Sequence, residues 1–208
     1  MGRARAARGI REGTAGVALR NRIAAARHST VRAAIHISRW GGMHHEGWRG
    51  EQTRRRLGQL IRDLGNLENE AWGIELGYCY DGSPVVWGDG DTGAAAPTDR
   101  YVPTTRPGAR PPSVILDDGT ALFDRFGVGF TLVRFADVDV SALAAAAEVC
   151  RVPLTVVDVR DRRARDLYER DLVLVRPDQH VAWRGDRLPD DPAAVIDRVR
   201  GMARGGTR

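Results

Sequence analysis

The chain has 208 residues, a hydrophobic content of 42% and a formal net charge of +5. That hydrophobic content is enough to build a folded core, so the composition excludes a wholly disordered protein. The length permits one large domain or two small ones. No apolar run reaches the roughly 18 residues that a membrane-spanning helix needs, so we expect no association with a membrane.

The cysteines and the N-terminus indicate the compartment. Cys79 and Cys150 lie far apart in the sequence and form no CxxC pair. So few thiols predict no disulfide framework, which favours a reducing environment. Residues 1–11 are basic, but neither an apolar stretch nor a cleavage pattern follows them, so they do not resemble a secretory signal. We therefore expect a cytoplasmic protein.

The positive charge raises the question of nucleic-acid binding. All 32 basic residues are arginine, and the isoelectric point is about 10. Such an excess can bind phosphate groups. Here the excess lies mainly before Arg62, whereas acidic residues alternate with arginines further on, as in residues 158–166. A solvated surface of mixed charge explains that alternation better, so nucleic acid is not favoured as a partner.

Residues 1–70 are expected to form a helical segment. Apolar residues recur at spacings of three and four between Leu19 and Trp40, which predicts one long amphipathic helix that ends at Gly41-Gly42.

A second helix is expected over residues 51–64, with Gly65 as its C-terminal stop. The apolar face of this helix consists of Leu57, Leu60, Ile61 and Leu64. Two amphipathic helices cannot bury their apolar stripes alone. Their partner surface could lie on the C-terminal domain, on a second copy of the chain, or on another protein.

Residues 71–112 are expected to be an extended connector. From Trp87 onward the composition shifts to Gly, Pro, Asp and Thr. Five prolines rule out a regular helix there, because proline lacks the amide hydrogen and clashes with the preceding turn. They are Pro97, Pro103, Pro107, Pro111 and Pro112.

Residues 113–204 are expected to fold as an α/β domain with a central mixed sheet and flanking helices. Apolar runs predict strands at residues 130–135 and 154–159, and a helix capped by Ser141 lies between them. A strand, helix and strand of this length imply a right-handed parallel crossover. The buried face of the helix is predicted to consist of Leu143, Ala146, Ala147 and Cys150.

The rest of this domain is predicted to be a helix, a hairpin and a last helix. The charged residues 161–171 favour a helix, and two strands flank an Arg-Pro-Asp-Gln turn with Pro177 and Asp178 at its centre. Asp191 and Pro192 are typical of a capped helix start. The residues Val195, Ile196, Val199 and Met202 share one face of that helix. The order βαβ followed by ββα is that of the thioredoxin fold.

Thioredoxin chemistry, however, is not expected. It needs a thiolate of low pKa and a resolving thiol at the start of the first helix. Asp139, Val140 and Ser141 stand at that position, and Cys150 lies at the opposite end of the helix. The domain is therefore predicted to lack dithiol redox activity.

A GxGxxG pattern follows a strand-like stretch, at Gly88, Gly90 and Gly93. A dinucleotide site would also need a helix that starts there, but Pro97 follows too soon. Asp89 and Asp91 would place negative charge against a phosphate. A calcium loop is not favoured either, because Arg100 stands where a bidentate glutamate is required. An ordinary glycine-rich turn is the better interpretation.

The histidines do not indicate a metal site. Four of them fall in one stretch, namely His28, His36, His44 and His45. No pair has the helical spacing of two ligands, and no cysteine or glutamate completes a tetrahedron, so surface positions are favoured. His180, beside the hairpin turn, is expected to be exposed. Neither a Gly-x-Ser-x-Gly elbow nor a Walker loop occurs.

Several segments together resemble one family, the FAD-dependent aromatic-ring hydroxylases of the phenol, pentachlorophenol and polyketide monooxygenase type. Their order and spacing match over about residues 71–202. The resembling segments are residues 74–84, 103–112, 116–124, 129–132 and 174–184. Residues 17–21 and the helices up to Leu64 resemble the helical segment that joins the flavin domain to this tail, whereas residues 1–16 match nothing.

The resemblance implies a thioredoxin-like tail without the thioredoxin cysteines. It places the chemistry in an upstream region, where a Rossmann domain holds FAD, NAD(P)H reduces it, and a flavin hydroperoxide hydroxylates the aromatic ring. No FAD-binding or catalytic position of the family has a counterpart in this sequence. We therefore assign no catalytic, cofactor-binding or metal-binding residue. FAD and NAD(P)H are implied by the family alone, and this chain by itself is expected to bind neither and to be inactive.

The sequence departs from the family pattern at two positions: Cys79 stands where arginine is common, and Gln179 where glycine often completes the turn. The expected partners are a flavin domain supplied in trans or a second copy of the chain. Two alternatives stay open. One is a non-catalytic interaction module that docks through the amphipathic helices, and the other is a nucleic-acid binder that acts through the arginines between Arg3 and Arg62.

Overall fold

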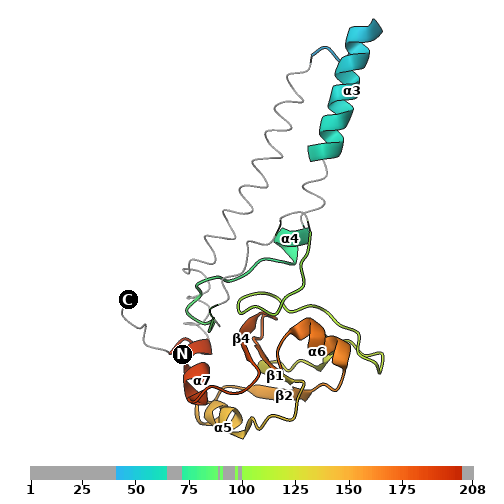
Figure 1. The fold of residues 1–208 in the computed structure, drawn as a ribbon. Coiled ribbons are helices and arrows are strands. Elements are labelled where there is room, and N and C mark those ends of the chain that lie inside the picture. Colours follow the sequence, from blue (N-terminus) through green and yellow to red (C-terminus); the bar gives the residue numbers. More distant parts are fainter. Residues whose placement is uncertain (1–40, 65–71, 89, 91–96, 98–99, 203–208) are drawn as a thin grey trace. The chain divides into compact units, whose positions relative to one another are not determined.

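The computed structural model describes residues 41–64, 72–88, 90, 97 and 100–202 (Figure 1). The chain divides into two compact units. The first comprises residues 19–77 and 96–102, and the second comprises residues 1–18, 78–95 and 103–208. The helix expected between Leu19 and Trp40 and the stop at Gly65 lie outside the described residues. Within the described part, no helix is long and apolar enough to cross a membrane.

The first unit contains helix α3, Gly47–Leu64, which confirms the second predicted helix and begins four residues earlier than expected. Leu57 on its apolar face is buried, whereas Ile61 is 48% exposed. The side chains of Leu60 and Leu64 lie outside the described set. The short helix α4, Trp72–Glu75, also belongs to this unit. A Cβ atom at Gly73 would lie 1.8 Å from the carbonyl oxygen of Pro97, so this close approach requires glycine.

The second unit is built around a four-stranded mixed sheet with the order β2-β1-β3-β4. The strands are β1 (Phe130–Arg134), β2 (Leu154–Asp158), β3 (Leu172–Val175) and β4 (Val181–Gly185). Strand β1 pairs parallel with β2 and antiparallel with β3. The pairing of β1 with β2 confirms that the predicted crossover is parallel, and β3 and β4 form the predicted hairpin.

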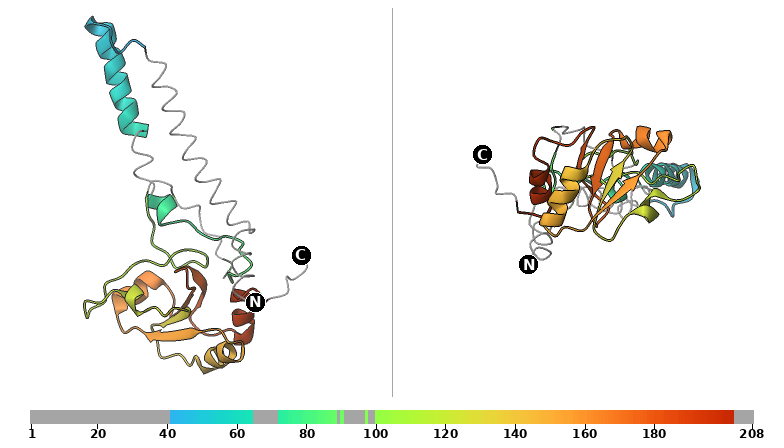
Figure 2. Two further views of the ribbon diagram at one scale, coloured as in Figure 1. Left: turned by 180° about the vertical axis from the view of Figure 1, so that it is seen from behind. Right: turned by 90° about the horizontal axis from the view of Figure 1, so that it is seen from below.

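Helices cover both faces of this sheet (Figure 2). Helices α5 (Ser141–Val149) and α7 (Pro192–Val199) pack on one face, and α6 (Arg162–Tyr168) packs on the other. Along β1, Leu132 points into the core between the sheet and helices α5 and α7, whereas Val133 points into the core on the α6 side. This follows because successive side chains of a strand face opposite sides. The 3-10 helix η1, Leu122–Arg125, adds Leu122 to the α6 side.

The helix starts differ from the prediction in one case. Ser141 does not cap α5: Val140 is the N-cap, and no side chain there accepts a hydrogen bond. Ser141 is already helical, and its amide donates to Asp139 Oδ1 at 2.9 Å, so the capping oxygen comes from earlier in the chain. In α7, by contrast, Asp191 accepts from the amide of Ala194 at 3.2 Å, and the proline follows as predicted.

Two segments of the expected connector extend the sheet beyond β4. The amide of Gly108 donates to the Val181 carbonyl at 2.7 Å, and the Val181 amide donates to the Ala109 carbonyl at 2.9 Å. The Tyr80 amide in turn donates to the Gly108 carbonyl at 2.9 Å, and Cys79 forms a bridge with Ala109. Gly108 has a φ of +94°, which side-chain-bearing residues rarely adopt. The outer edge of β4 is therefore paired at Val181. The domain limits expected from the sequence stay a prediction.

Candidate functional site

The most unusual polar cluster of the second unit lies at the tip of the β3–β4 hairpin. His180 was expected to be exposed, and this expectation is wrong, since its side chain is only 3% exposed. Its ring packs against both Tyr78 and Tyr80, with centroid distances of 4.9 and 4.7 Å. The two tyrosines come from a segment about a hundred residues earlier in the sequence, so the local pattern around the turn could not reveal them.

The turn itself agrees with the prediction. The amide of Gln179 donates to the Arg176 carbonyl at 2.9 Å, and the Arg176 amide donates to the His180 carbonyl at 2.8 Å. Pro177 and Asp178 thus occupy the centre of the turn. Gln179 has a φ of +62°, the left-handed conformation that favours glycine at this place in a three-residue hairpin loop.

Hydrogen bonds fix the orientation of His180. Its Nδ1 atom lies 2.8 Å from the Asp178 carbonyl oxygen. Because a carbonyl can only accept, Nδ1 carries a hydrogen and donates it to Asp178. In the part of the chain that the structure describes, Nε2 is buried and has no hydrogen-bond partner.

Arg176 lies beside this histidine and is also buried. Its Nη2 atom donates to Asp178 Oδ2 at 2.7 Å, and its Cζ atom lies 5.6 Å from the centroid of the Tyr80 ring. Its Nη1 atom is the second buried polar atom without a partner among the described residues. Burial opposes ionisation of Asp178, but the His180 hydrogen bond and the Arg176 charge outweigh it and hold the pKa of Asp178 below its usual value.

Arg110 completes the cluster from a third segment. Its Nη2 atom donates to Gln179 Oε1 at 2.9 Å, and its Cζ atom lies 5.1 Å from the ring centroid of Phe123. Two neutral groups therefore hold this guanidinium in place.

Burial, reinforced by the neighbouring Tyr80 and Asp178, raises the pKa of Tyr78 to about 12, although the charge of Arg110 opposes this shift.

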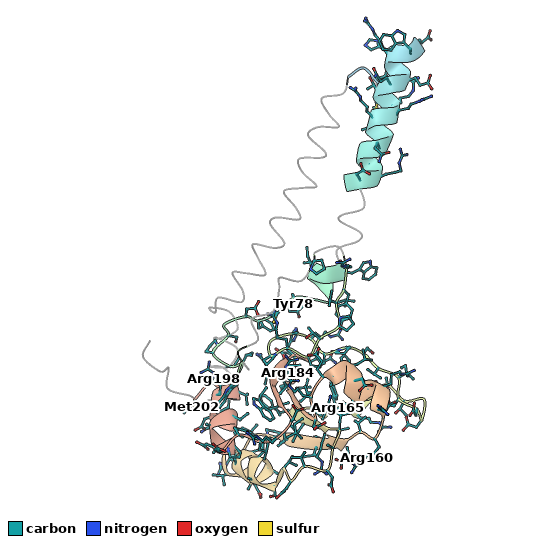
Figure 3. The ribbon with its side chains drawn as sticks, in the orientation of Figure 1. Tyr78, Arg160, Arg165, Arg184, Arg198 and Met202 are labelled. Carbon is teal, nitrogen blue, oxygen red and sulfur yellow. The ribbon has the colours of Figure 1, made fainter. Side chains whose placement is uncertain are left out.

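We call this arrangement the hairpin-tip cluster (Tyr78 is labelled in Figure 3). It consists of Tyr78, Tyr80, Arg110, Arg176, Asp178, Gln179 and His180. None of these residues was a candidate for function in the sequence. The available signal was the density of polar and aromatic residues in three separate segments, but nothing in the sequence shows that those segments meet.

A second buried network holds the segment that leads to Arg110. The Thr105 hydroxyl donates to the Tyr168 carbonyl at 2.5 Å and accepts from Arg184 Nη1 at 3.4 Å. The same Arg184 atom pairs with Glu169 (Arg184 is labelled in Figure 3). The Tyr168 hydroxyl donates to the Pro112 carbonyl at 3.1 Å. These bonds tie residues 105–112 to the end of α6.

The two thiols do not form a redox pair, and both are free. Cys79 is buried, and burial raises the pKa of its thiol to about 12, so it is protonated at neutral pH. Cys150 lies at the C-terminal end of α5. At the start of α5, where thioredoxin would carry a thiolate, Asp139 accepts the amide of Ser141, and this bond lowers the pKa of the carboxyl group.

The remaining sequence motifs acquire no binding geometry. His44 and His45 are exposed, and His28 and His36 lie outside the described residues. Within the described ranges, no group of three metal-ligating side chains comes together. Of the GxGxxG pattern, Gly88 and Gly90 are exposed, while the third glycine and both aspartates lie outside the described residues.

The comparisons with known proteins identify the domain. Residues 104–203 match the family model described as aromatic-ring hydroxylase, C-terminal. The chain contains an aromatic-ring hydroxylase C-terminal domain. Curated proteins similar to it include the FAD-dependent monooxygenase opdD of Penicillium oxalicum, with 33% identity over 74% of this chain and 30% of that protein. The phenol 2-monooxygenase of a Pseudomonas species is 30% identical over 73% of this chain and 28% of that protein.

Solved structures agree with this family. RebC with bound 7-carboxy-K252c has a TM-score of 0.69 at 41% identity, covering 78% of this chain and 31% of RebC. The flavin-dependent monooxygenase PieE, in complex with FAD and substrate, has a TM-score of 0.58 at 29% identity, covering 77% of this chain and 30% of PieE. The hydroxylase C-terminal domain and the segments before it thus span less than a third of the length of these relatives.

Proposed function

We propose that this chain is the C-terminal part of an FAD- and NAD(P)H-dependent aromatic-ring hydroxylase and acts together with a flavin-binding part. The observation that carries this proposal is the match of residues 104–203 to the hydroxylase C-terminal family. The similarity to RebC supports it, because that similarity also includes residues outside the family match. The aromatic substrate would be set by the flavin-binding part.

In this proposal the domain supports the enzyme and does not carry out the chemistry. FAD and NAD(P)H would be held by the flavin-binding part, which would supply the hydroxylation chemistry. The protonated thiol of Cys79 and the carboxylate of Asp139 at the start of α5 are consistent with a domain that has no dithiol role. Two free cysteines agree with a cytoplasmic location.

The test uses the purified chain and the flavin-binding part of RebC, that is, RebC without the region similar to this chain. We expect the chain alone to carry no visible flavin absorbance after incubation with FAD. We expect a one-to-one complex with the RebC part by size-exclusion chromatography with light scattering. Tight binding of FAD by the chain alone, or failure to form the complex, would contradict the proposal.

A second candidate is a homodimerisation module, and the exposed apolar side chains of α3 favour it. Trp48 is 69% exposed and Ile61 is 48% exposed on this helix. Ile61 extends the apolar face that Leu57 begins one turn earlier, and an apolar helix face that is left exposed can pair with a partner. Light scattering over a range of concentrations separates the two candidates, since a strictly monomeric chain would exclude this one.

A further inference from the structure

The hairpin-tip cluster has the composition of a protein-docking surface. Tyr78, Tyr80 and Arg110 are each half-buried, so every one of them keeps part of its side chain at the surface. Tyrosine and arginine are the residues that most often dominate binding energy at protein interfaces, and a rigid tyrosine loses little conformational entropy when it binds. Here the two tyrosine rings are 5.6 Å apart and perpendicular to each other, and both pack on His180.

Arg110 differs from several other half-buried arginines of the domain. Arg125, Arg134 and Arg165 each pair with an aspartate. Among the described residues, Arg110 pairs with no carboxylate, and the Gln179 amide and the Phe123 ring hold its guanidinium in place. A guanidinium fixed in advance binds a carboxylate at low entropic cost and can do so through two parallel hydrogen bonds.

The layer beneath the surface is rigid. Arg176 and His180 are both buried and joined through Asp178, and both pack against the Tyr80 ring. Arg176 Nη1 and His180 Nε2 are both buried and have no hydrogen-bond partner among the described residues. Buried polar groups of this kind need a structural or functional reason. Here they belong to a base that fixes the two tyrosines.

Three sequence segments that resemble the hydroxylase family meet at this surface. Tyr78 and Tyr80 come from residues 74–84, Arg110 from residues 103–112, and the hairpin from residues 174–184. The relatives opdD, an FAD-dependent monooxygenase, and phenol 2-monooxygenase extend well beyond the region similar to this chain, which covers 30% and 28% of their lengths. A surface built from segments that resemble this family therefore suits the flavin-binding part, which we take as the remainder of the hydroxylase.

We propose that the hairpin-tip cluster docks onto the flavin-binding part of the hydroxylase, with an aspartate or glutamate of that partner bound to Arg110. Tyr78 and Tyr80 pack around this ion pair and shield it from water. The inference rests on the proposed function, because it takes the flavin-binding part as the occupant. It adds the surface, the anchor residue and the charge of the group that the anchor binds.

The test measures binding of the full chain and its variants to the flavin-binding part of RebC by calorimetry. We expect Arg110→Glu to weaken binding by about tenfold or more, because it places two carboxylates against each other. Arg110→Gln, which keeps the length of the side chain without its charge, should weaken binding less. The matched control is Arg162→Glu, an exposed site on α6 outside the cluster, which should change the affinity by less than about twofold.

Amide hydrogen exchange gives a second measurement that does not depend on substitutions. On binding, we expect added protection at residues 78–80 and 178–181 and no change along α5. The docking surface is wrong, and the proposed function stands, if the wild-type chain binds without added protection at these residues and Arg110→Glu binds with the same affinity. If the wild-type chain does not bind at all, the proposed function fails, and this inference fails with it.

Discussion

Replacing Thr105 with valine should destabilise the hydroxylase C-terminal domain by about 1.5 kcal/mol, because it removes one hydroxyl from a fully buried position. The magnitude follows from what the hydroxyl contacts. It donates a 2.5 Å hydrogen bond to the Tyr168 carbonyl and accepts a longer one, of 3.4 Å, from Arg184. Both partners keep other bonds: the Tyr168 carbonyl also accepts from the Arg170 amide at 2.8 Å, and Arg184 still pairs with Glu169.

The cost is therefore one good hydrogen bond and part of another, and no buried group is left without a partner. For a domain of about 100 residues, this corresponds to a fall in Tm of roughly 5 to 10 °C. Urea denaturation followed by circular dichroism measures the free energy of unfolding. Thr155→Val on exposed strand β2 is the control and should change it by less than about 0.5 kcal/mol. A Thr105→Val variant as stable as the wild type would refute the view that this network ties residues 105–112 to α6.

The remaining predictions concern the core, a thiol and a carboxylate. Leu174→Ala at a fully buried site of β3 should cost about 3 kcal/mol in urea denaturation, whereas Val156→Ala, 37% exposed, should cost less than about 1 kcal/mol. Cys79, with a raised pKa and a buried side chain, should resist iodoacetamide at pH 8 until denaturant is added, as mass spectrometry would show. The hydrogen bond from the Ala164 amide lowers the pKa of Asp161. The stabilising effect of this carboxylate is therefore present at neutral pH and is lost as the pH falls below 3.8. Urea titrations from pH 7 to about pH 3 should show a smaller loss of unfolding free energy for Asp161→Asn than for the wild type.

The strands and the last helix could be predicted because their signals are local. Leu172 and Leu174 face one core while Val173 and Val175 face the other, so the central strand is an uninterrupted apolar run. The start of α7 is encoded by adjacent residues, since Asp191 supplies the capping oxygen that the sequence indicated. Ser141 shows the limit of such reasoning. Serine is a common cap, but the backbone placed it inside the first turn and used Asp139 instead.

The pairing of residues 108–109 with β4 could not be predicted, because it involves backbone groups. An extended stretch rich in proline and glycine has no hydrophobic period, so its composition indicates only a connector. The hydrogen bonds between Gly108 and Val181 depend on a φ of +94° and on a close approach to Cys79. Glycine permits that geometry, but the sequence does not show which strand edge it will meet.

His180 shows why the candidate site was missed. A histidine next to a hairpin turn is normally exposed, and that position was the basis of the expectation. Its burial results from the chain segment at Tyr78 and Tyr80, which the hydrogen bond between Tyr80 and Gly108 holds beside the hairpin. The same hairpin residues that resemble the hydroxylases thus have a physical role that their local pattern did not reveal. They form the rigid base under two tyrosines and, through Gln179, orient the arginine to which we assign the docking of the flavin-binding part.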